Sequence, residues 1–294
     1  MKNTIHLLAA LLLFGCAEKR EPVGCGKPVV FVSIPPQAGL VRILAGDRVE
    51  IHTLVGEGQS PHAYEPTARQ LVRLGEADAL LTIGMPFEKH LLKKIVPLYP
   101  DLPIVGTEAG IELRAMPHEY HGEHCSTDHG AKDPHVWLSP ANAISIAKAI
   151  FQALGKIDPA NANEYRRNFE KLATEFRQLN DEIQNMLAPY AGSRFYVFHP
   201  SFGYFADAYG LEQIPVELDG KAPSPRQLVA LVEQAKADGV KVVFVQKQFP
   251  SGSAKAIADA IGGTVVQLDP LAEDVVANLR LIAESLEKAL GNRN

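Results

Sequence analysis

Short apolar runs alternate with amphipathic segments along most of the chain. In the first half, runs with the length and composition of buried strands occur at residues 29–33, 49–55, 79–83 and 102–105. The same kind of run recurs in the second half at residues 195–198, 213–216, 242–245 and 264–268. Strand–helix alternation with continuously apolar strands is typical of a parallel sheet covered on both faces. We therefore predict an α/β protein with two such units.

The segments between these runs have helical periodicity. Predicted helices include residues 67–76, 87–96, 225–237, 254–261 and 272–290. Ser139-Pro140, Asp158-Pro159 and Ser224-Pro225 each place a capping side chain before a proline, which is typical of a helix start. After Asp158, apolar residues recur every three or four positions from Tyr165 to Leu187. This stripe predicts one helix of about 28 residues, roughly 42 Å long, that joins the two units.

The N-terminus has the pattern of a secretory signal. Lys2 precedes an apolar stretch, residues 5–14, that is far shorter than the roughly 20 residues of a membrane-spanning helix. The stretch ends in Leu-Phe-Gly-Cys16, which looks like a bacterial lipobox. We predict that Cys16 carries lipid and anchors an extracytoplasmic protein to a membrane. A plain cleaved signal or a buried N-terminal helix is the alternative.

These features predict five segments. They are a lipoprotein signal peptide at 1–15, a tether at 16–27, an N-terminal α/β lobe at 28–139 with a histidine-rich loop at 117–132, a helical linker at 140–190, and a C-terminal α/β lobe at 191–294. Cys25 lies in the tether and Cys125 in the loop, and their spacing leaves open whether they pair.

Composition narrows the functional classes. The 294 residues, 46% of them hydrophobic, are enough for two domains with real cores. The formal net charge of −5, from 29 basic and 34 acidic residues, gives no support to nucleic-acid binding and is compatible with a cationic ligand. Nothing in the sequence demands more than a monomer.

Three histidines and one aspartate stand in proline-marked contexts where an apolar run gives way to a turn. They are His62 in SPHAYEP, His135 in DPHVWL, His199 in FHPSFG and Asp269 in LDPL. Ligands bind beyond the carboxyl ends of parallel strands, and each half supplies two of these residues, so we expect the site between the halves. Imidazoles with one carboxylate make a tetrahedral site that suits zinc. Glu65 is the alternative carboxylate.

A polar, aperiodic stretch holds four further histidines. They are His118, His121, His124 and His129. Their density predicts accessory metal capture by a loop, and a solvated linker that happens to be histidine-rich is the alternative.

Several motifs together carry a resemblance to a known family. They are Ser60-Pro61-His62 with Tyr64-Glu65-Pro66, residues 133–138, His199-Pro200 with residues 202–205, Pro223-Ser224-Pro225, and residues 268–271. With them the chain resembles the cluster A-I solute-binding proteins of bacterial ABC importers for zinc and manganese, over nearly all of the mature chain. The resemblance implies two lobes joined by a rigid helix, a membrane permease as partner and no enzymatic activity. It also implies His62, His135, His199 and Asp269 as metal ligands.

The chain departs from this family at Gln246, where many relatives carry a glutamate, and this puts in doubt any role for an acid at that position. Relatives that handle manganese often replace the third histidine with a carboxylate, whereas His199 keeps three imidazoles here. Imidazole suits zinc, so Zn(II) is the predicted cargo and Mn(II) or Fe(II) the alternative.

Two other classes remain open. If Asp269 were not a ligand, three histidines and a water would fit a secreted zinc hydrolase with Glu65 as base. The sequence contains no HExxH or Gly-x-Ser-x-Gly motif in support of it. A surface adhesin is the third class.

Overall fold

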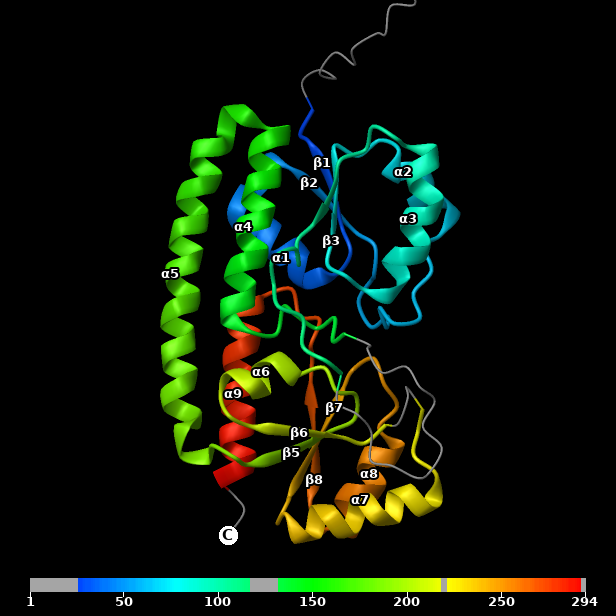
Figure 1. The fold of residues 1–294 in the computed structure, drawn as a ribbon, viewed down its shortest axis with the longest axis vertical. Coiled ribbons are helices and arrows are strands. Elements are labelled where there is room, and N and C mark those ends of the chain that lie inside the picture. Colours follow the sequence, from blue (N-terminus) through cyan, green and yellow to red (C-terminus); the bar gives the residue numbers. More distant parts are fainter. Residues whose placement is uncertain (1–25, 117–131, 218–220, 292–294) are drawn as a thin grey trace, which may run out of the picture.

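The computed structural model describes residues 26–116, 132–217 and 221–291, and it contains two parallel four-stranded sheets (Figure 1). The N-terminal sheet has the order β2-β1-β3-β4 and comprises β1 (Val29–Val32), β2 (Glu50–Thr53), β3 (Ala79–Thr82) and β4 (Ile104–Gly106). The C-terminal sheet has the order β6-β5-β7-β8 and comprises β5 (Arg194–Val197), β6 (Glu212–Pro215), β7 (Val242–Gln246) and β8 (Thr264–Leu268). In both sheets the strand order reverses beside the first strand, which is where open α/β sheets bind ligands.

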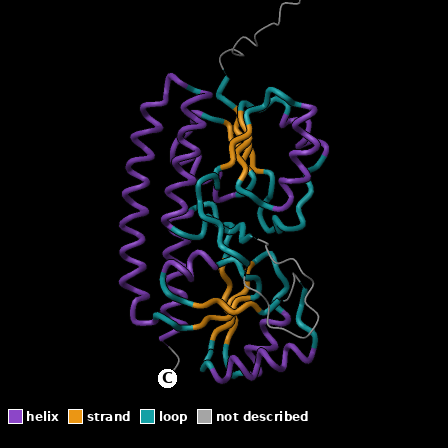
Figure 2. Tube along the Cα trace, viewed as in Figure 1, coloured by secondary structure: helices purple, strands orange, loops and turns teal. Residues whose placement is uncertain are grey.

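Helices cover both faces of each sheet, as the alternation of apolar runs predicts (Figure 2). They are α1 (Pro35–Ala45), α2 (Ala68–Leu74), α3 (Pro86–Leu98), α4 (Pro140–Ile157), α5 (Ala162–Leu187), α6 (Gly203–Ala208), α7 (Pro225–Ala237), α8 (Gly252–Ala260) and α9 (Val275–Gly291). Helices α1, α4, α5 and α9 form one side of the molecule, and α2, α3, α7 and α8 lie on the other side of the sheets (Figure 1). The two-lobed α/β prediction is confirmed.

The long helix α5 spans both lobes. It packs against α1 and α4 of the N-terminal half and against α9 of the C-terminal half. Its buried positions form the predicted stripe: Tyr165, Leu172, Ala173, Phe176, Leu179, Ile183 and Leu187. The helix has 26 residues, about 39 Å at 1.5 Å per residue. It starts later than predicted because Pro159–Asn161 forms a separate 3₁₀ turn.

Local capping differs in part from prediction. Ser139 is the N-cap residue of α4, but its side chain makes no capping hydrogen bond. The Asp158 carboxylate accepts hydrogen bonds from Asn161 Nδ2 and the Tyr165 hydroxyl, so it fixes the turn between α4 and α5. Ser224 donates its backbone N–H to Gln227 Oε1 at 2.9 Å, as in a helix capping box. Helix α6 was not predicted, because it has only six residues.

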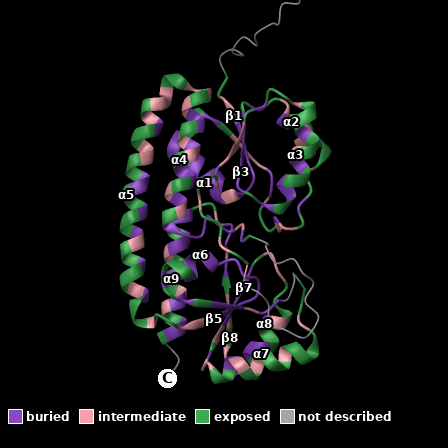
Figure 3. Cartoon of the chain, in the orientation of Figure 1, coloured by how far each residue is buried: buried purple, intermediate pink, exposed green. Residues whose placement is uncertain are grey.

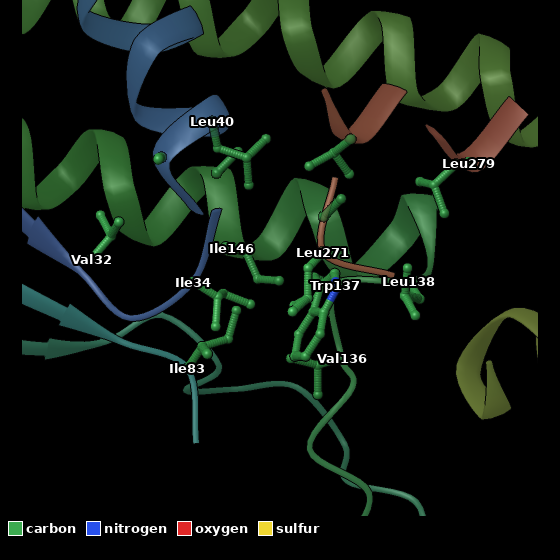
Figure 4. Close-up of a cluster of buried hydrophobic side chains, with 14 of the residues drawn as sticks. Val32, Ile34, Leu40, Ile83, Val136, Trp137, Leu138, Ile146, Leu271 and Leu279 are labelled. Carbon is green, nitrogen blue, oxygen red and sulfur yellow. The ribbon is translucent and has the colours of Figure 1, made fainter. Parts of the chain in front are cut away.

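One large hydrophobic core joins the two lobes along the α5 side (Figure 3). It combines the N-terminal sheet, the helices of that side, and C-terminal residues such as Phe195 and Phe244. Trp137 lies within it, 1% exposed, near Leu271 and Ile34 (Figure 4). A second, smaller core lies between the C-terminal sheet and α7 and α8. Because packed cores deform little, the shared core limits how far the lobes can separate.

Within the residues that the structure describes, none of the helices is both long and apolar enough to cross a bilayer.

Candidate metal centre

The Nε2 atoms of His62, His135 and His199 form a compact triangle between the two sheets. Their separations are 3.1 Å for His62–His135, 3.0 Å for His62–His199 and 3.2 Å for His135–His199. Four ligands about 2.05 Å from a tetrahedral zinc ion lie about 3.3 Å from one another. The triangle therefore has nearly the size of one face of a zinc coordination tetrahedron.

Each histidine is placed by a loop at the end of a regular element. His62 lies in the connection between β2 and α2, His135 lies in the turn before α4, and His199 lies two residues after the end of β5. Pro61, Pro134 and Pro200 adjoin them in sequence. A proline fixes its own φ angle, so these loops have fewer conformations to lose when their ligand atoms are held together.

A buried carboxylate orients His135. Asp133 Oδ1 lies 2.7 Å from His135 Nδ1 and accepts the His135 backbone N–H at 3.0 Å, and Asp133 itself is fully buried. Burial alone would raise the pKa of Asp133, but hydrogen bonds from His135 and Arg114 outweigh it and hold the pKa below its usual value. The ionised Asp133 keeps the ring proton on Nδ1 and leaves the Nε2 lone pair for a metal.

Arg114 extends this network into the C-terminal half. Its Nη1 donates to Asp133 Oδ2 at 3.0 Å, and its Nε donates to Asp207 Oδ2, in α6, at 2.8 Å. The Tyr204 hydroxyl donates to the Asp133 carbonyl oxygen at 2.9 Å. A Cβ atom at Gly203 would lie 1.8 Å from Arg114 Nη1 and 2.7 Å from Asp133 Oδ2, so a larger residue here would displace this pair of side chains.

Different groups hold His199. Its Nδ1 lies 2.5 Å from Oε1 of the buried Glu217. Gln246, fully buried, accepts the His199 backbone N–H at 3.1 Å and donates Nε2 to the His199 carbonyl oxygen at 2.5 Å. Phe249 stacks on the His199 ring with centroids 4.8 Å apart. The amide of Gln246 thus both donates and accepts, which an ionised glutamate cannot do.

His62 has a different environment. Desolvation by burial and the neighbouring His135 and His199 rings lower the pKa of His62 to about 3. Burial also lowers the pKa of His135. Both rings are therefore neutral at physiological pH, as metal ligands must be. Within the described ranges, nothing hydrogen-bonds to His62 Nδ1, whereas the other two histidines each have a carboxylate partner.

The structure does not bring Asp269 into the cluster. The group whose ligand atoms lie within 4.8 Å of one another consists of the three histidines. Asp269 Oδ1 instead accepts from Leu271 N at 3.0 Å and Gln248 Nε2 at 3.2 Å, and Oδ2 lies 3.2 Å from Lys247 Nζ. The segment that carries Asp269 contacts the segment that carries His135 through one hydrogen bond: the Trp137 indole donates to the Pro270 carbonyl oxygen at 2.7 Å. Glu65, the alternative carboxylate, is also outside the three-histidine group.

Other predicted residues lie outside the described ranges. They are Cys16, Cys25, Cys125, His118, His121, His124 and His129.

Comparisons with known proteins bear on this site. The model of the family "ZnuA: Zinc-uptake complex component A periplasmic" matches residues 30–289. The chain belongs to this family. It is 30% identical to the high-affinity zinc uptake system protein ZnuA of Paracoccus denitrificans, over 95% of this chain and 94% of that protein. The first curated relatives, zinc-binding proteins AdcA of Streptococcus pyogenes, match at 24% identity, and the chain spans 56% of their length.

Two solved structures extend the comparison. A crystal structure of a ZnuA superposes with a TM-score of 0.83 at 36% identity, covering 90% of this chain and all of that one. The solute-binding protein FpvC of Pseudomonas aeruginosa, in complex with Mn²⁺, superposes with a TM-score of 0.76 at 28% identity, covering 92% of this chain and all of that one.

Four residues that hold the histidines, directly or through Asp133, were not predicted: Asp133, Glu217, Gln246 and Arg114. Asp133 stands in the DPHVWL motif and Gln246 marks a departure from the family, but neither signal reveals which histidine the residue contacts. Glu217 gave one usable signal, since it is an acid placed directly after an apolar strand. Arg114 gave none, because it lies in an irregular segment and meets Asp133 only through the fold.

Proposed function

We propose that this protein is the extracytoplasmic solute-binding component of a zinc ABC importer. It captures Zn(II) between its two lobes, with His62, His135 and His199 as ligands, and delivers the ion to a membrane permease. The histidine-rich loop residues His118–His129 act as accessory capture sites. We also propose that residues 1–15 are removed as a signal peptide and that lipid on Cys16 anchors the chain through a tether to residue 27.

The observation that carries this proposal is the Nε2 triangle with sides of 3.0–3.2 Å. Three imidazoles supply nitrogen donors at near-tetrahedral spacing, which suits zinc. Carboxylates on His135 and His199 fix which ring nitrogen faces the ion and strengthen it as a donor. The family to which the chain belongs favours a transport component over an enzyme.

Capture and release follow from the donor set. Each histidine replaces a water around the ion, and two of the three come from the N-terminal half while His199 comes from the C-terminal half. Metal loss therefore removes one of the links between the halves. The shared core and the single long helix α5 allow only a small rearrangement, which we expect to open a path for the ion toward the permease.

The fourth ligand position has two protein candidates. Asp269 is the one predicted from sequence, and its carboxylate would have to leave Lys247 and Gln248 to reach the ion. Glu65 is the alternative, three residues from His62. A water or an outside ligand also suffices for a four-coordinate ion.

A competition titration tests the proposal. Metal-free protein that lacks residues 1–25 is titrated with zinc against an indicator of known affinity, alongside His62→Ala, His135→Ala and His199→Ala. We expect one tight zinc site that each substitution weakens at least about 100-fold, since each removes one of three protein ligands. His52→Ala is the matched control, because His52 lies on β2 and its ring contacts Glu50 rather than the cluster. Zinc binding that survives all three substitutions would refute the site.

Manganese and iron(II) are the alternative cargo. The observation that supports manganese as an alternative is the Mn²⁺ complex of the related FpvC structure. Adding Mn(II) or Fe(II) to the zinc titration decides the matter: we expect neither to displace zinc at comparable concentration, because imidazole sites favour zinc over both. Manganese that competes on equal terms would move the function to manganese uptake.

The hydrolase and adhesin classes have their own signatures. Ester or peptide turnover that disappears in His199→Ala would indicate a hydrolase, and metal-independent binding to a protein surface would indicate an adhesin. We expect neither from the purified protein.

A further inference from the structure

A cavity of about 240 Å³ adjoins the histidine cluster. It lies between the loop that carries His62 and helices α2 and α3, and His62 forms part of its wall. His135 and His199 do not line it. The cavity therefore gives access to one of the three histidines from outside the triangle.

His62 differs from the other two histidines in the hydrogen bonding of its Nδ1 atom. A metal-bound histidine uses the lone pair of one ring nitrogen, and its other nitrogen carries a proton that almost always has an acceptor. Asp133 and Glu217 accept from His135 and His199. No described residue accepts from His62 Nδ1. The Nδ1 proton of a zinc-bound His62 is therefore open to a water or to a ligand in the cavity.

Two charged groups line the cavity, the ammonium group of Lys94 and the carboxylate of Glu65. Lys94 lines the cavity, and none of the ion pairs between described residues involves it. His90 adds a second imidazole to the wall. Lys94 offers a carboxylate a charge-assisted hydrogen bond, which is about twice as strong as a hydrogen bond to a neutral acceptor such as water.

The remaining walls define the rest of the ligand. Tyr64, Leu71, Phe87 and Leu91 present aromatic and aliphatic surface to the cavity. At about 30 Å³ per water molecule in the liquid, 240 Å³ corresponds to about eight water-sized volumes. A branched aliphatic group with one carboxylate fills such a space and buries its apolar part.

We propose that this cavity binds a small aliphatic carboxylate, which accepts a hydrogen bond from His62 Nδ1 and pairs with Lys94. The inference rests on the proposed function, because His62 must ligate zinc through Nε2. The bound carboxylate keeps the ring proton of His62 on Nδ1, as Asp133 does for His135. Glu65, also in the wall, faces the same ligand and would pair with an ammonium group if the carboxylate belongs to an amino acid.

Isovalerate titrated into the zinc-loaded protein tests this inference. Calorimetry measures its affinity, and the ¹⁵N shifts of the histidine ring nitrogens report where it binds. A zinc indicator in the same sample shows that the metal stays bound. We expect saturable binding that moves the His62 Nδ1 signal and leaves the His135 and His199 Nδ1 signals in place.

Two lysine variants separate a built site from general charge attraction. Lys94→Gln should weaken isovalerate binding about tenfold, because a charge-assisted hydrogen bond is lost. Lys93→Gln is the matched control: Lys93 is the neighbouring exposed lysine of α3 and does not line the cavity. Equal losses in both variants, or no saturable binding to wild-type protein, would overturn the inference while the three-histidine zinc site stands. Loss of zinc binding in the earlier titration would instead refute the proposed function.

Two further probes identify the ligand class. Isobutylamine, which lacks the carboxylate, should not bind, and binding of it would contradict the inference. L-Valine should bind more tightly than isovalerate, and lose that advantage in Glu65→Gln, if the natural ligand is an amino acid. Equal affinities for valine and isovalerate would assign the cavity to simple carboxylates.

Discussion

The two lobes hold their histidines in different ways. In the N-terminal half, both oxygens of Asp133 are used, one by His135 and one by Arg114. In the C-terminal half, Glu217 uses Oε1 for His199, and its buried Oε2 has no partner among the described residues. The backbone of His199 is fixed separately, by the neutral Gln246. One lobe thus relies on a closed network of charges, and the other divides the task between a carboxylate and an amide.

Among the substitutions that separate the two lobes, Gln246→Glu should have the largest effect, a loss of folding stability. The change buries a carboxylate with 0% exposure and replaces the amide donor to the His199 carbonyl oxygen. An uncompensated buried charge destabilises a protein by about 3–5 kcal/mol, so chemical denaturation should show a loss of that order. Gln246→Met is the control, since it removes the hydrogen bonds without adding charge and should lose less. Equal losses would show that the charge is immaterial.

Asp133→Asn and Glu217→Gln compare the two carboxylates directly. Partners of metal-binding histidines typically contribute 10–100-fold to metal affinity. We expect Asp133→Asn to weaken zinc binding about 100-fold, because it also leaves Arg114 without a charged partner in the cluster, and Glu217→Gln about tenfold. Zinc titration of both variants measures the difference. A larger loss in Glu217→Gln would show that Glu217 contributes more to zinc affinity than Asp133 does.

Acid should destabilise the metal-free protein. The pKa of His62 is about 3 in the folded state and near 6.5 in the unfolded chain. Between these values only the unfolded chain binds the proton, so stability is lost as the pH falls below about 6.5. The loss is at most about 1.4 kcal/mol per pH unit for this group. Unfolding at several pH values should show a shallower slope in His62→Ala, and an unchanged slope would contradict the assignment.

Asp207→Asn tests the exposed end of the Arg114 network. The Asp207 side chain is 59% exposed, and exposed ion pairs contribute about 0–1 kcal/mol. We expect zinc affinity to change less than about fivefold, with the effect diminishing in high salt. Glu182→Gln breaks a comparable exposed pair with Arg280, remote from the cluster, and serves as the control. A loss as large as that in Asp133→Asn would show that the lobes are coupled through Arg114.

Asp269→Asn should have the smallest effect on zinc. Both carboxylate oxygens are held within the C-terminal lobe, by Leu271, Gln248 and Lys247. We expect zinc affinity to stay within about threefold of wild type, with a modest loss of thermal stability from the turn. A drop of tenfold or more would establish Asp269 as the fourth ligand that its motif predicts.

Much of the fold follows from local pattern. Continuous apolar runs predict strands that are buried on both faces, and the three- and four-residue spacing from Tyr165 to Leu187 predicts the helix that joins the lobes. The short helix α6 was missed because six residues carry too little periodicity to recognise. The start of α5 was placed early because Asp158 and Pro159 resemble a helix start, whereas Asp158 bonds to Tyr165 and closes a separate turn.

The sequence by itself determined which three histidines to expect at the site, because each adjoins a proline where an apolar run and a turn meet. Only the tertiary structure decided which carboxylates serve them. Asp269 has the motif of a ligand, but Leu271, Gln248 and Lys247 hold its carboxylate. Glu217 and Arg114 act through partners that are distant in sequence. Hydrogen bonds depend on direction and on separations near 3 Å, and these are set when the two sheets and helix α5 pack together. A linear pattern records which residues are available, but not which of their atoms meet.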